Sequence, residues 1–351
     1  MKKVCFFVSK IENSGGTEKS SINLGNHLVK NGYEVFFFNL IGSPNAFFEI
    51  DKNIKIYSLN LKNNSTRKNF FKIILELRNF LKNNEIDILI DVDSILTFFS
   101  IFSKIGLNIK HISWEHFNFN IDLGVKFRRI GRWFAAKYCD YIVVLTNKDK
   151  KLWKKNLKIN SEIINIPNSI NSKNNFSKRE KIILSIGRPA YVKGYDLLLN
   201  IWSKIYKSNI EWKLKIIGCD EEYDFLNKKI NELGLNNVEL VNATKTIDFF
   251  YKEASIYCMT SRFEGLPMVL LEAQSYGLPI VAFDCNTGPD EIIINGSNGF
   301  LIEINDIDNF CDKLQYLMNN EILYQDMVEK SYKNIKRFDN SAILSEWMKI
   351  L

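Results

Sequence analysis

The sequence predicts an α/β protein with two parallel-sheet domains, and two observations support this. Residues 255–283 follow the pattern strand, loop, helix, strand: apolar runs at 255–259 and 280–283 flank a helix that Pro267 would open and Gly277 would close. Such a unit joins two parallel strands of one sheet. The chain has 351 residues, more than one hydrophobic core usually supports, so we expect two domains.

In the first domain, short apolar runs alternate with helical segments. The predicted strands are residues 3–9, 35–40, 54–59, 86–92, 109–114, 141–145 and 163–166. Gly15 and Gly16 stand just before the first predicted helix. Glycines there let the backbone approach a ligand and leave amides free to bind it. The spacing is not the dinucleotide motif G-x-G-x-x-G, so a plain strand-to-helix turn is the alternative interpretation.

The second domain follows a polar tract rich in Asn, Ser, Lys and Arg, which predicts a linker. Its predicted strands are residues 182–186, 214–218, 255–259 and 280–283, and the chain ends in a series of helices. The expected division is a first domain at 1–170, a linker at 171–181, a second domain at 182–335 and a C-terminal helix at 336–351.

Composition excludes several classes of protein. With 46% hydrophobic and 25% charged residues, the chain has an ordinary globular composition. The apolar run at 3–9 is too short for a signal peptide or a spanning helix. The six cysteines are scattered without a C-x-x-C pair, and there are three histidines, so we expect free thiols in a reducing cytoplasm and no metal site.

Positive charge is concentrated in the first half. Residues 1–170 hold 26 Lys and Arg against 15 Asp and Glu, a balance of +11, whereas residues 171–351 hold 21 against 25, a balance of −4. Such a field suits an anionic membrane or lipid diphosphate, although the charges could simply be solvated. Nucleic acid is the least favoured partner because no recognised motif accompanies the charge. The basic and aromatic stretch 126–137 fits either a helix lying on a membrane or a core helix.

Two glutamates separated by seven residues mark the strand–helix–strand unit as a candidate site. Glu264 lies in the loop after the first strand, where parallel sheets bind ligands. Glu272 lies about one and a half turns into the helix, so the two carboxylates would hold different ends of one ligand. The amides of Gly265 and Leu266 favour an anion such as phosphate. The alternative is that Glu264 caps the helix and Glu272 lies on its solvated face.

Cationic side chains follow another predicted strand, 182–186. Arg188 comes after Gly187 and can bind two oxygens at once, and Lys193 supplies a point charge, which together suit a diphosphate. His116 follows the strand 109–114 and is expected at its carboxyl edge. A lone histidine is more often structural.

The stretch Phe263-Glu-Gly-Leu-Pro-Met-Val-Leu-Leu-Glu-Ala and the Gly-Arg and Lys-Gly pairs within 187–194 resemble the glutamate-x7-glutamate signature and donor loop of the retaining glycosyltransferases of family 4. The resemblance covers nearly the full length and is strongest over residues 182–302. It implies the GT-B fold, in which two Rossmann-like domains face each other across a cleft and the last helix crosses back to the first domain.

The resemblance also implies roles for individual residues. The family's first glutamate meets the hydroxyls of the donor sugar and its second meets the ribose, which implies Glu264 and Glu272. Its arginine and lysine neutralise the leaving nucleoside diphosphate, which implies Arg188 and Lys193, and its cleft histidine corresponds to His116. Further candidates for the nucleotide-sugar site are Gly15, Gly16, Gly187, Gly265, Leu266 and Pro267.

Two other segments bear on the donor. Many relatives have aspartate and glycine after the strand 214–218, whereas this chain has Cys219 followed by Asp-Glu-Glu, so no base contact is assigned there. The loop 284–291 resembles the family's glycine-and-glutamate loop, and we expect it to help select the sugar.

The implied function is a metal-independent retaining transferase. It would move a hexose or N-acetylhexosamine from a nucleoside diphosphate sugar, by family frequency a UDP-sugar, to a hydroxyl of a lipid-linked or surface glycan such as lipopolysaccharide or capsule. The protein is expected in the cytoplasm or on the inner face of the membrane. A nucleotide-sugar epimerase of the same fold and a non-catalytic partner subunit that binds sugar nucleotides stay open as alternatives.

Overall fold

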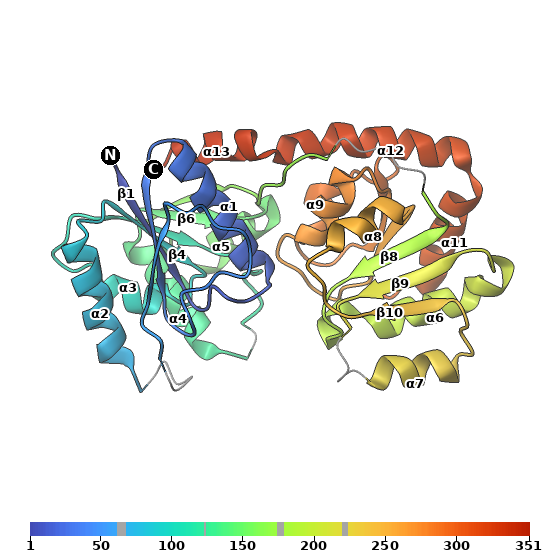
Figure 1. Ribbon diagram of the computed structural model, residues 1–351, viewed down its shortest axis with the longest axis horizontal. Helices are drawn as coiled ribbons and strands as arrows, with labels where there is room; N and C mark the ends of the chain where they lie inside the picture. Colours follow the sequence, from blue (N-terminus) through green and yellow to red (C-terminus); the bar gives the residue numbers. More distant parts are fainter. Residues whose placement is uncertain (62–67, 123, 174–178, 220–223) are drawn as a thin grey trace. The chain divides into compact units, whose positions relative to one another are not determined.

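The computed structural model describes residues 1–61, 68–122, 124–173, 179–219 and 224–351. The chain forms two compact units, one made of Met1–Ser169 with Asn340–Leu351 and the other of Ile170–Asp339. Parts of two segments considered above, the linker residues 174–178 and the acidic run 220–222, lie outside the described residues. Each unit is a parallel sheet with helices packed against it (Figure 1).

The first unit contains a seven-stranded parallel sheet in the order β3-β2-β1-β4-β5-β6-β7. Its strands are β1 (Lys3–Val8), β2 (Glu34–Asn39), β3 (Lys55–Ser58), β4 (Ile88–Val92), β5 (Lys110–Trp114), β6 (Tyr141–Val144) and β7 (Glu162–Asn165). The strand order reverses between β1 and β4. In such sheets the loops beyond the carboxyl ends of the strands at this point form the ligand crevice.

The helices of the first unit pack apolar side chains onto both faces of this sheet. They are α1 (Gly16–Lys30), α2 (Phe70–Asn83), α3 (Thr97–Ser103), α4 (Lys126–Tyr138), α5 (Asn147–Asn156) and α13 (Asn340–Met348). The C-terminal α13 belongs to this unit, because the ring of Trp347 lies edge-on to that of Trp114 with centroids 4.8 Å apart. Lys110 Nζ also donates to the carbonyl of Leu351, at 3.1 Å. Among the helices in the described residues, none is both long enough and apolar enough to cross a membrane.

The second unit contains a six-stranded parallel sheet in the order β10-β9-β8-β11-β12-β13. Its strands are β8 (Ile182–Ile186), β9 (Lys213–Ile217), β10 (Val238–Val241), β11 (Ile256–Met259), β12 (Ile280–Phe283) and β13 (Gly299–Ile302). Its α-helices are α6 (Tyr195–Ile205), α7 (Asp224–Glu232), α8 (Ile247–Glu253), α9 (Met268–Ser275), α10 (Pro289–Ile292), α11 (Ile307–Asn319) and α12 (Glu321–Ile335), and a short 3₁₀ helix, η1 (Tyr191–Lys193), precedes α6.

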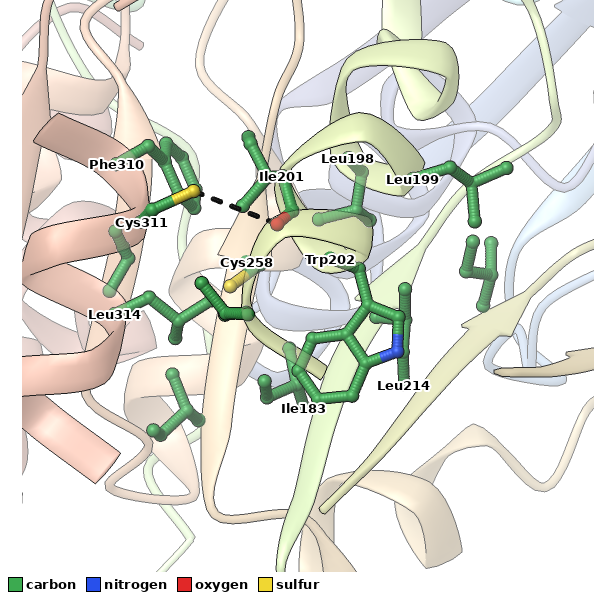
Figure 2. Close-up of a cluster of buried hydrophobic side chains, with 14 of the residues drawn as sticks. Ile183, Leu198, Leu199, Ile201, Trp202, Leu214, Cys258, Phe310, Cys311 and Leu314 are labelled. Carbon is green, nitrogen blue, oxygen red and sulfur yellow. Dashed lines mark hydrogen bonds between the residues drawn. The ribbon is translucent and has the colours of Figure 1, made fainter. Parts of the chain in front are cut away.

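Figure 2 shows the core of the second unit, where α6 and α11 pack against the sheet. The indole of Trp202 is fully buried among apolar side chains such as Ile183 and Leu214. The thiol of Cys311 donates to the carbonyl oxygen of Ile201 at 3.6 Å, which joins the two helices. All six cysteines are free and buried, as their scattered positions predicted. The sheet edge that carries the candidate residues is therefore supported by a buried apolar core.

The α/β class and the two parallel sheets are confirmed, and most strands were predicted to within a residue or two of their ends. Two strands were missed: β10 is only partly buried, and β13 begins with Gly299, which weakens the apolar signal. Pro267 caps α9 from just outside, so the helix begins one residue later than the sequence suggested, and Gly277 lies past its end with a φ of 69°.

The described ends of the predicted linker are bonded to the second unit. Lys173 N donates to the carbonyl oxygen of Ser275, and the guanidinium of Arg179 donates to the carbonyl oxygens of Tyr276 and Gly277 at 2.7 and 3.1 Å. The boundaries of the compact units accordingly lie at Ile170 and Asp339.

Candidate active site

Two loops leave the sheet of the second unit side by side. β8 pairs directly with β11, with Ile183 opposite Ile256, so the chain emerges from both strands at the same edge. The first loop, 187–194, carries the glycine and the two cations predicted from the sequence, and the second, 260–267, carries the first glutamate. This is the edge at which parallel sheets bind ligands. The structure therefore brings together the candidates of both loops.

Lys193 and Glu264 form an ion pair between these loops. Lys193 Nζ lies 2.8 Å from Glu264 Oε1. The two side chains are 24% and 14% exposed, so they are largely sheltered but remain within reach of a ligand. The sequence assigned the lysine to a phosphate and the glutamate to a sugar. The structure places the two groups in contact, so one ligand that carries both parts could touch both.

Arg188 is the second cation of the site and differs from Lys193 in its surroundings. Its side chain is exposed, and it makes no hydrogen bond or ion pair with any other part of the chain that the structure describes. A guanidinium binds two oxygens of one anion through parallel N–H donors. Arg188 is therefore free to bind a ligand without first breaking a protein contact.

Arg262 joins the two loops and was not predicted from the sequence. Its guanidinium donates to both carboxylate oxygens of Asp196, at 3.0 and 2.7 Å, and to the carbonyl of Tyr191 at 2.6 Å. It also lies 4.0 Å from the centre of the Tyr191 ring, a cation–π contact. Its backbone N–H donates to Val192 O at 2.8 Å. The hydrogen bonds from Arg262 lower the pKa of Asp196 and so keep its carboxylate charged.

Backbone contacts hold the loops too close together for extra side-chain atoms. Gly194 has a φ of 65°, and a Cβ there would lie 2.1 Å from the carbonyl oxygen of Thr260. Thr260 Oγ1 donates to the carbonyl of Gly194 at 2.9 Å. The loop after β12 joins them, because Thr287 Oγ1 donates to the carbonyl of Glu264 at 2.7 Å and a Cβ on Gly288 would meet Gly265 O at 2.3 Å. The loop predicted to select the sugar thus contacts the loop of the first glutamate.

Glu272 lies on α9 and is buried. Its Oε2 accepts a hydrogen bond from the hydroxyl of Tyr251 at 2.7 Å. The solvated position considered as the alternative is therefore wrong for Glu272. Capping is wrong for Glu264, since Pro267 occupies the N-cap of α9 and no side chain caps it. Leu266 and Pro267 lie between the two glutamates in the sequence. Both are buried, and they form the turn that leads into the helix.

The remaining predicted residues belong to the first unit. Gly15 is the N-cap of α1 and Gly16 its first residue, and no side chain caps this helix start, so the helix begins one residue earlier than the sequence suggested. His116 follows β5, is 7% exposed and packs against the Trp114 ring with centroids 4.5 Å apart. Its Nε2 is buried without a hydrogen-bond partner in the described structure. Burial lowers the pKa of His116 to about 3, so the ring is neutral.

A buried charge network lies next to His116, and sequence reasoning missed it. Arg132 Nε donates to Glu115 Oε2 at 2.7 Å, and Arg128 Nη1 lies 2.5 Å from Asp93 Oδ1. Asp93 follows β4 at the switch point of the sheet with a φ of 100°, a backbone conformation that non-glycine residues rarely adopt. Strained residues of this kind cluster at functional sites. The one signal in the sequence was the position of Asp93 at a strand end.

Comparisons with known proteins agree with this geometry. Residues 14–174 match the family model described as Glycosyltransferase Family 4, and residues 168–334 match the one described as Glycosyl transferases group 1. An uncharacterized glycosyltransferase of Haemophilus influenzae is 41% identical over the whole of both chains. A relative from Campylobacter jejuni, named as an α-1,4-N-acetyl-D-galactosaminyltransferase that acts on an undecaprenol-diphosphate-linked glycan, is 27% identical over 100% of this chain and 98% of its own.

Solved structures show the same fold. The S. aureus protein TarM, solved as a mutant with UDP, α-GlcNAc-glycerol and fondaparinux, is 18% identical and superposes with a TM-score of 0.84 over 100% of this chain and 99% of its own. At that identity the likeness bears on the fold alone. Together with the two family matches and the Haemophilus relative, these findings show that the chain belongs to the family 4 glycosyltransferases of the GT-B fold.

Proposed function

We propose that this glycosyltransferase moves a hexose or N-acetylhexosamine from a UDP-sugar to a hydroxyl of a lipid-linked or surface glycan, with retention at the anomeric carbon and without a metal ion. The observation that carries the proposal is the contact of Lys193 with Glu264 at the strand ends of the second unit, beside the unengaged Arg188. The two cations suited to a diphosphate stand on one loop, 187–194, and the carboxylate suited to sugar hydroxyls stands on the adjacent loop, in contact with Lys193.

The main barrier to such a reaction is departure of the nucleoside diphosphate. The bond from the anomeric carbon to the diphosphate oxygen breaks, its electron pair stays on the diphosphate, and the carbon gains oxocarbenium character. We assign the developing phosphate charge to Arg188 and Lys193, in place of a metal ion. Glu264 accepts hydrogen bonds from the sugar, which fixes its orientation, and Glu272 accepts from the ribose.

The donor and acceptor classes rest on the relatives. The TarM structure contains UDP, and the Campylobacter relative is named for a glycan on undecaprenol diphosphate. A lipid-linked acceptor lies at a membrane, and the balance of +11 over residues 1–170 favours an anionic surface. We therefore assign the acceptor to the first unit and place the protein at the inner face of the cytoplasmic membrane.

The first-unit candidates are proposed by resemblance. The amides at Gly15 and Gly16 suit a phosphate or a hydroxyl, since they are not capped by a side chain. His116 is neutral, so its free Nε2 can accept or donate a single hydrogen bond to substrate but carries no charge with which to balance a phosphate.

Release of nucleoside diphosphate from a panel of UDP- and GDP-sugars tests the function. The reaction is followed with and without a bacterial lipid extract, in EDTA and in its absence. We expect one donor to release diphosphate faster when the extract is present and the rate to be unaffected by EDTA. The anomeric configuration of the product, read by proton NMR, tests retention.

The other outcomes are informative. Conversion of the donor sugar with no acceptor present would assign the protein as an epimerase, and donor binding without diphosphate release would assign it as a non-catalytic partner. Loss of activity in EDTA that magnesium restores would overturn the role given to Arg188 and Lys193.

A further inference from the structure

Helix α4 buries two of its three arginines and exposes two large apolar residues, Ile130 and Trp133, the reverse of an ordinary surface helix. Arg128 and Arg132 point into the first unit, where they pair with Asp93 and Glu115. Gly131 lies between them, and a Cβ there would meet the Ser94 carbonyl oxygen at 2.2 Å. This face of α4 therefore lies directly against the backbone of the turn before α3. The core interpretation is correct for this face of the helix.

The opposite face of α4 is open to solvent and partly apolar. Ile130 and Trp133 are 40% and 44% exposed, and Tyr138 is similarly exposed at the helix end. The exposed basic residues Lys126 and Lys137 stand on the same stripe, because Lys126 precedes Ile130 by four residues and Lys137 follows Trp133 by four. Lys137 Nζ lies 4.9 Å from the centre of the Trp133 ring.

The exposed face continues across two neighbouring helices. α2 packs against α3 and α3 against α4, all on one face of the sheet (Figure 1). Phe71 on α2 is 77% exposed. Aromatic rings in successive contact, with centroids no more than 6.0 Å apart, connect it to the end of α4 through Phe71, Phe70, Phe98, Phe134, Trp133 and Tyr138. We call this surface of α2, α3 and α4 the aromatic face.

Basic side chains surround the aromatic face. Of the five Lys and Arg of α4, Lys126, Arg129 and Lys137 are exposed, and the helix has no acidic residue. Lys72 is exposed beside Phe71 on α2. Three acids lie nearby: Asp122 is paired with Arg129 at 2.7 Å, the half-buried Glu76 lies on α2, and Asp140, just after α4, accepts a hydrogen bond from the backbone N–H of His111. An exposed apolar surface with basic residues among its aromatic side chains is typical of proteins that lie at an anionic lipid interface.

We propose that the aromatic face docks the first unit onto the surface of an anionic lipid bilayer. Trp133, Tyr138 and Phe71 would enter the headgroup region, where amphipathic and aromatic rings are favoured, and the lysines would meet lipid phosphates. Lipid is favoured over a second copy of the chain because the exposed Lys72, Lys126 and Lys137 of two copies would repel each other. The inference deepens the membrane association proposed above, and its test needs neither donor nor acceptor.

Tryptophan fluorescence gives a direct measurement. All six tryptophans lie in the described residues, and Trp133 is the exposed one while the other five are buried. The full-length protein is mixed with vesicles of phosphatidylglycerol and brominated phosphatidylcholine, because bromine quenches a tryptophan only at short range. We expect quenching with these vesicles, little quenching when phosphatidylglycerol is omitted, and none in a Trp133→Phe variant.

Matched substitutions test the face by vesicle flotation. Ile130→Glu places an acid on the aromatic face, and Ile322→Glu makes the same change at an 85% exposed position on α12 of the second unit. We expect the partition coefficient of Ile130→Glu to fall at least about tenfold, since an apolar contact is lost and a repelled charge is added. Ile322→Glu should bind as the wild type does, and added salt should weaken binding of both.

Several results would overturn the proposal. These are failure of the wild type to bind anionic vesicles, equal binding to neutral ones, or an equal effect of the two glutamate substitutions. A wild-type dimer that Ile130→Glu converts to a monomer would assign the face to self-association instead. Because vesicle binding is measured without turnover, an inactive protein that still binds vesicles would refute the transferase proposal and leave the docking proposal intact.

Discussion

Both the side chain and the backbone of Glu264 are fixed by contacts with neighbouring loops. Its carboxylate meets Lys193 Nζ at 2.8 Å, and its carbonyl accepts the hydroxyl of Thr287 at 2.7 Å. A carboxylate fixed in this way needs little reorganisation to meet a sugar hydroxyl, and groups already in place contribute most to stabilising a transition state. This fixed geometry supports the role proposed for Glu264, the orientation of a ligand.

Replacing Glu264 by glutamine tests this role. The amide keeps the size of the side chain but loses its charge, so Lys193 loses its partner and the sugar loses a strong acceptor. We expect kcat to fall on the order of 10²- to 10³-fold, with a melting temperature close to that of the wild type. Steady-state kinetics and circular dichroism measure both, and Glu321→Gln, at an exposed position of α12, is the matched control. Unchanged turnover in Glu264→Gln would move the sugar site elsewhere.

The buried His116 makes the stability of the folded protein depend on pH. Burial lowers the pKa of His116 from 6.5 to about 3 in the folded state. Between these values the unfolded chain binds a proton that the folded one does not, so this residue makes the protein less stable as the pH falls below 6.5. We expect His116 to lower the free energy of unfolding by up to about 1.4 kcal/mol for each pH unit below 6.5. Urea unfolding of the wild type and His116→Asn, compared from pH 7 to pH 4, measures it, and parallel curves would contradict it.

The buried Asp149 makes stability depend on pH in the opposite direction. Burial raises the pKa of Asp149 from 3.8 to about 7, although its Oδ1 accepts a hydrogen bond from the amide of Phe119 at 2.7 Å. The folded state then binds the extra proton between these values, so Asp149 makes the protein less stable as the pH rises. In the same unfolding series, Asp149→Asn should differ from the wild type with a slope opposite to that of His116→Asn.

At the scale of the element, the site consists of loops that one side chain, Arg262, joins in addition to their close backbone contacts. Arg262 reaches Asp196, Tyr191 and Val192 and so ties the loop after β11 to η1 and the start of α6. Lys193 is the residue between these contacts, and its placement opposite Glu264 depends on them. Arg262 is therefore a positioning residue for the ion pair.

Arg262→Ala should release the loop that carries Lys193. We expect KM for the donor to rise about tenfold or more, because a misplaced lysine weakens diphosphate binding, while kcat changes less. Arg262→Lys should recover little, since a lysine cannot make the two-pronged contact with Asp196. Lys204→Ala, which breaks an exposed ion pair with Asp308 at 2.6 Å, is the control and should leave KM unchanged. An equal loss of kcat in Arg262→Ala with KM unaffected would refute a positioning role.

The sequence predicted elements better than contacts between them. Strands such as β8 and β11 are continuous apolar runs because helices cover both faces, and such runs are visible without a structure. The pairing of Arg262 with Asp196 was not predictable, because it depends on how β8 and β11 align. The inward arginines of α4 were missed for another reason: at helical spacing an arginine is normally assigned to the solvent side, and only the neighbouring Asp93 and Glu115 reverse this.

At the scale of the whole molecule, each of the two units has hydrophobic clusters of its own within the described residues. One surrounds Trp202 in the second unit, and the first unit has its own clusters beneath α2 and α4. The C-terminal helix α13 returns to the first unit and packs Trp347 on Trp114. Each unit therefore has the packing that it needs to unfold as a unit of its own.

We predict two calorimetric transitions that respond to different changes. Trp347→Ala removes a buried ring from the first unit and should cost about 3–5 kcal/mol, which lowers one transition and leaves the other in place. UDP at about one hundred times its Kd should stabilise the unit that binds it by about 2.7 kcal/mol and raise the transition that Trp347→Ala does not affect, by roughly 5–10 °C. Trp347→Phe, which keeps an aromatic ring, is the control and should cost less. If UDP and Trp347→Ala shifted the same transition, the nucleotide would bind the first unit, and Lys193, Arg188 and Glu264 would lose their role in the donor site.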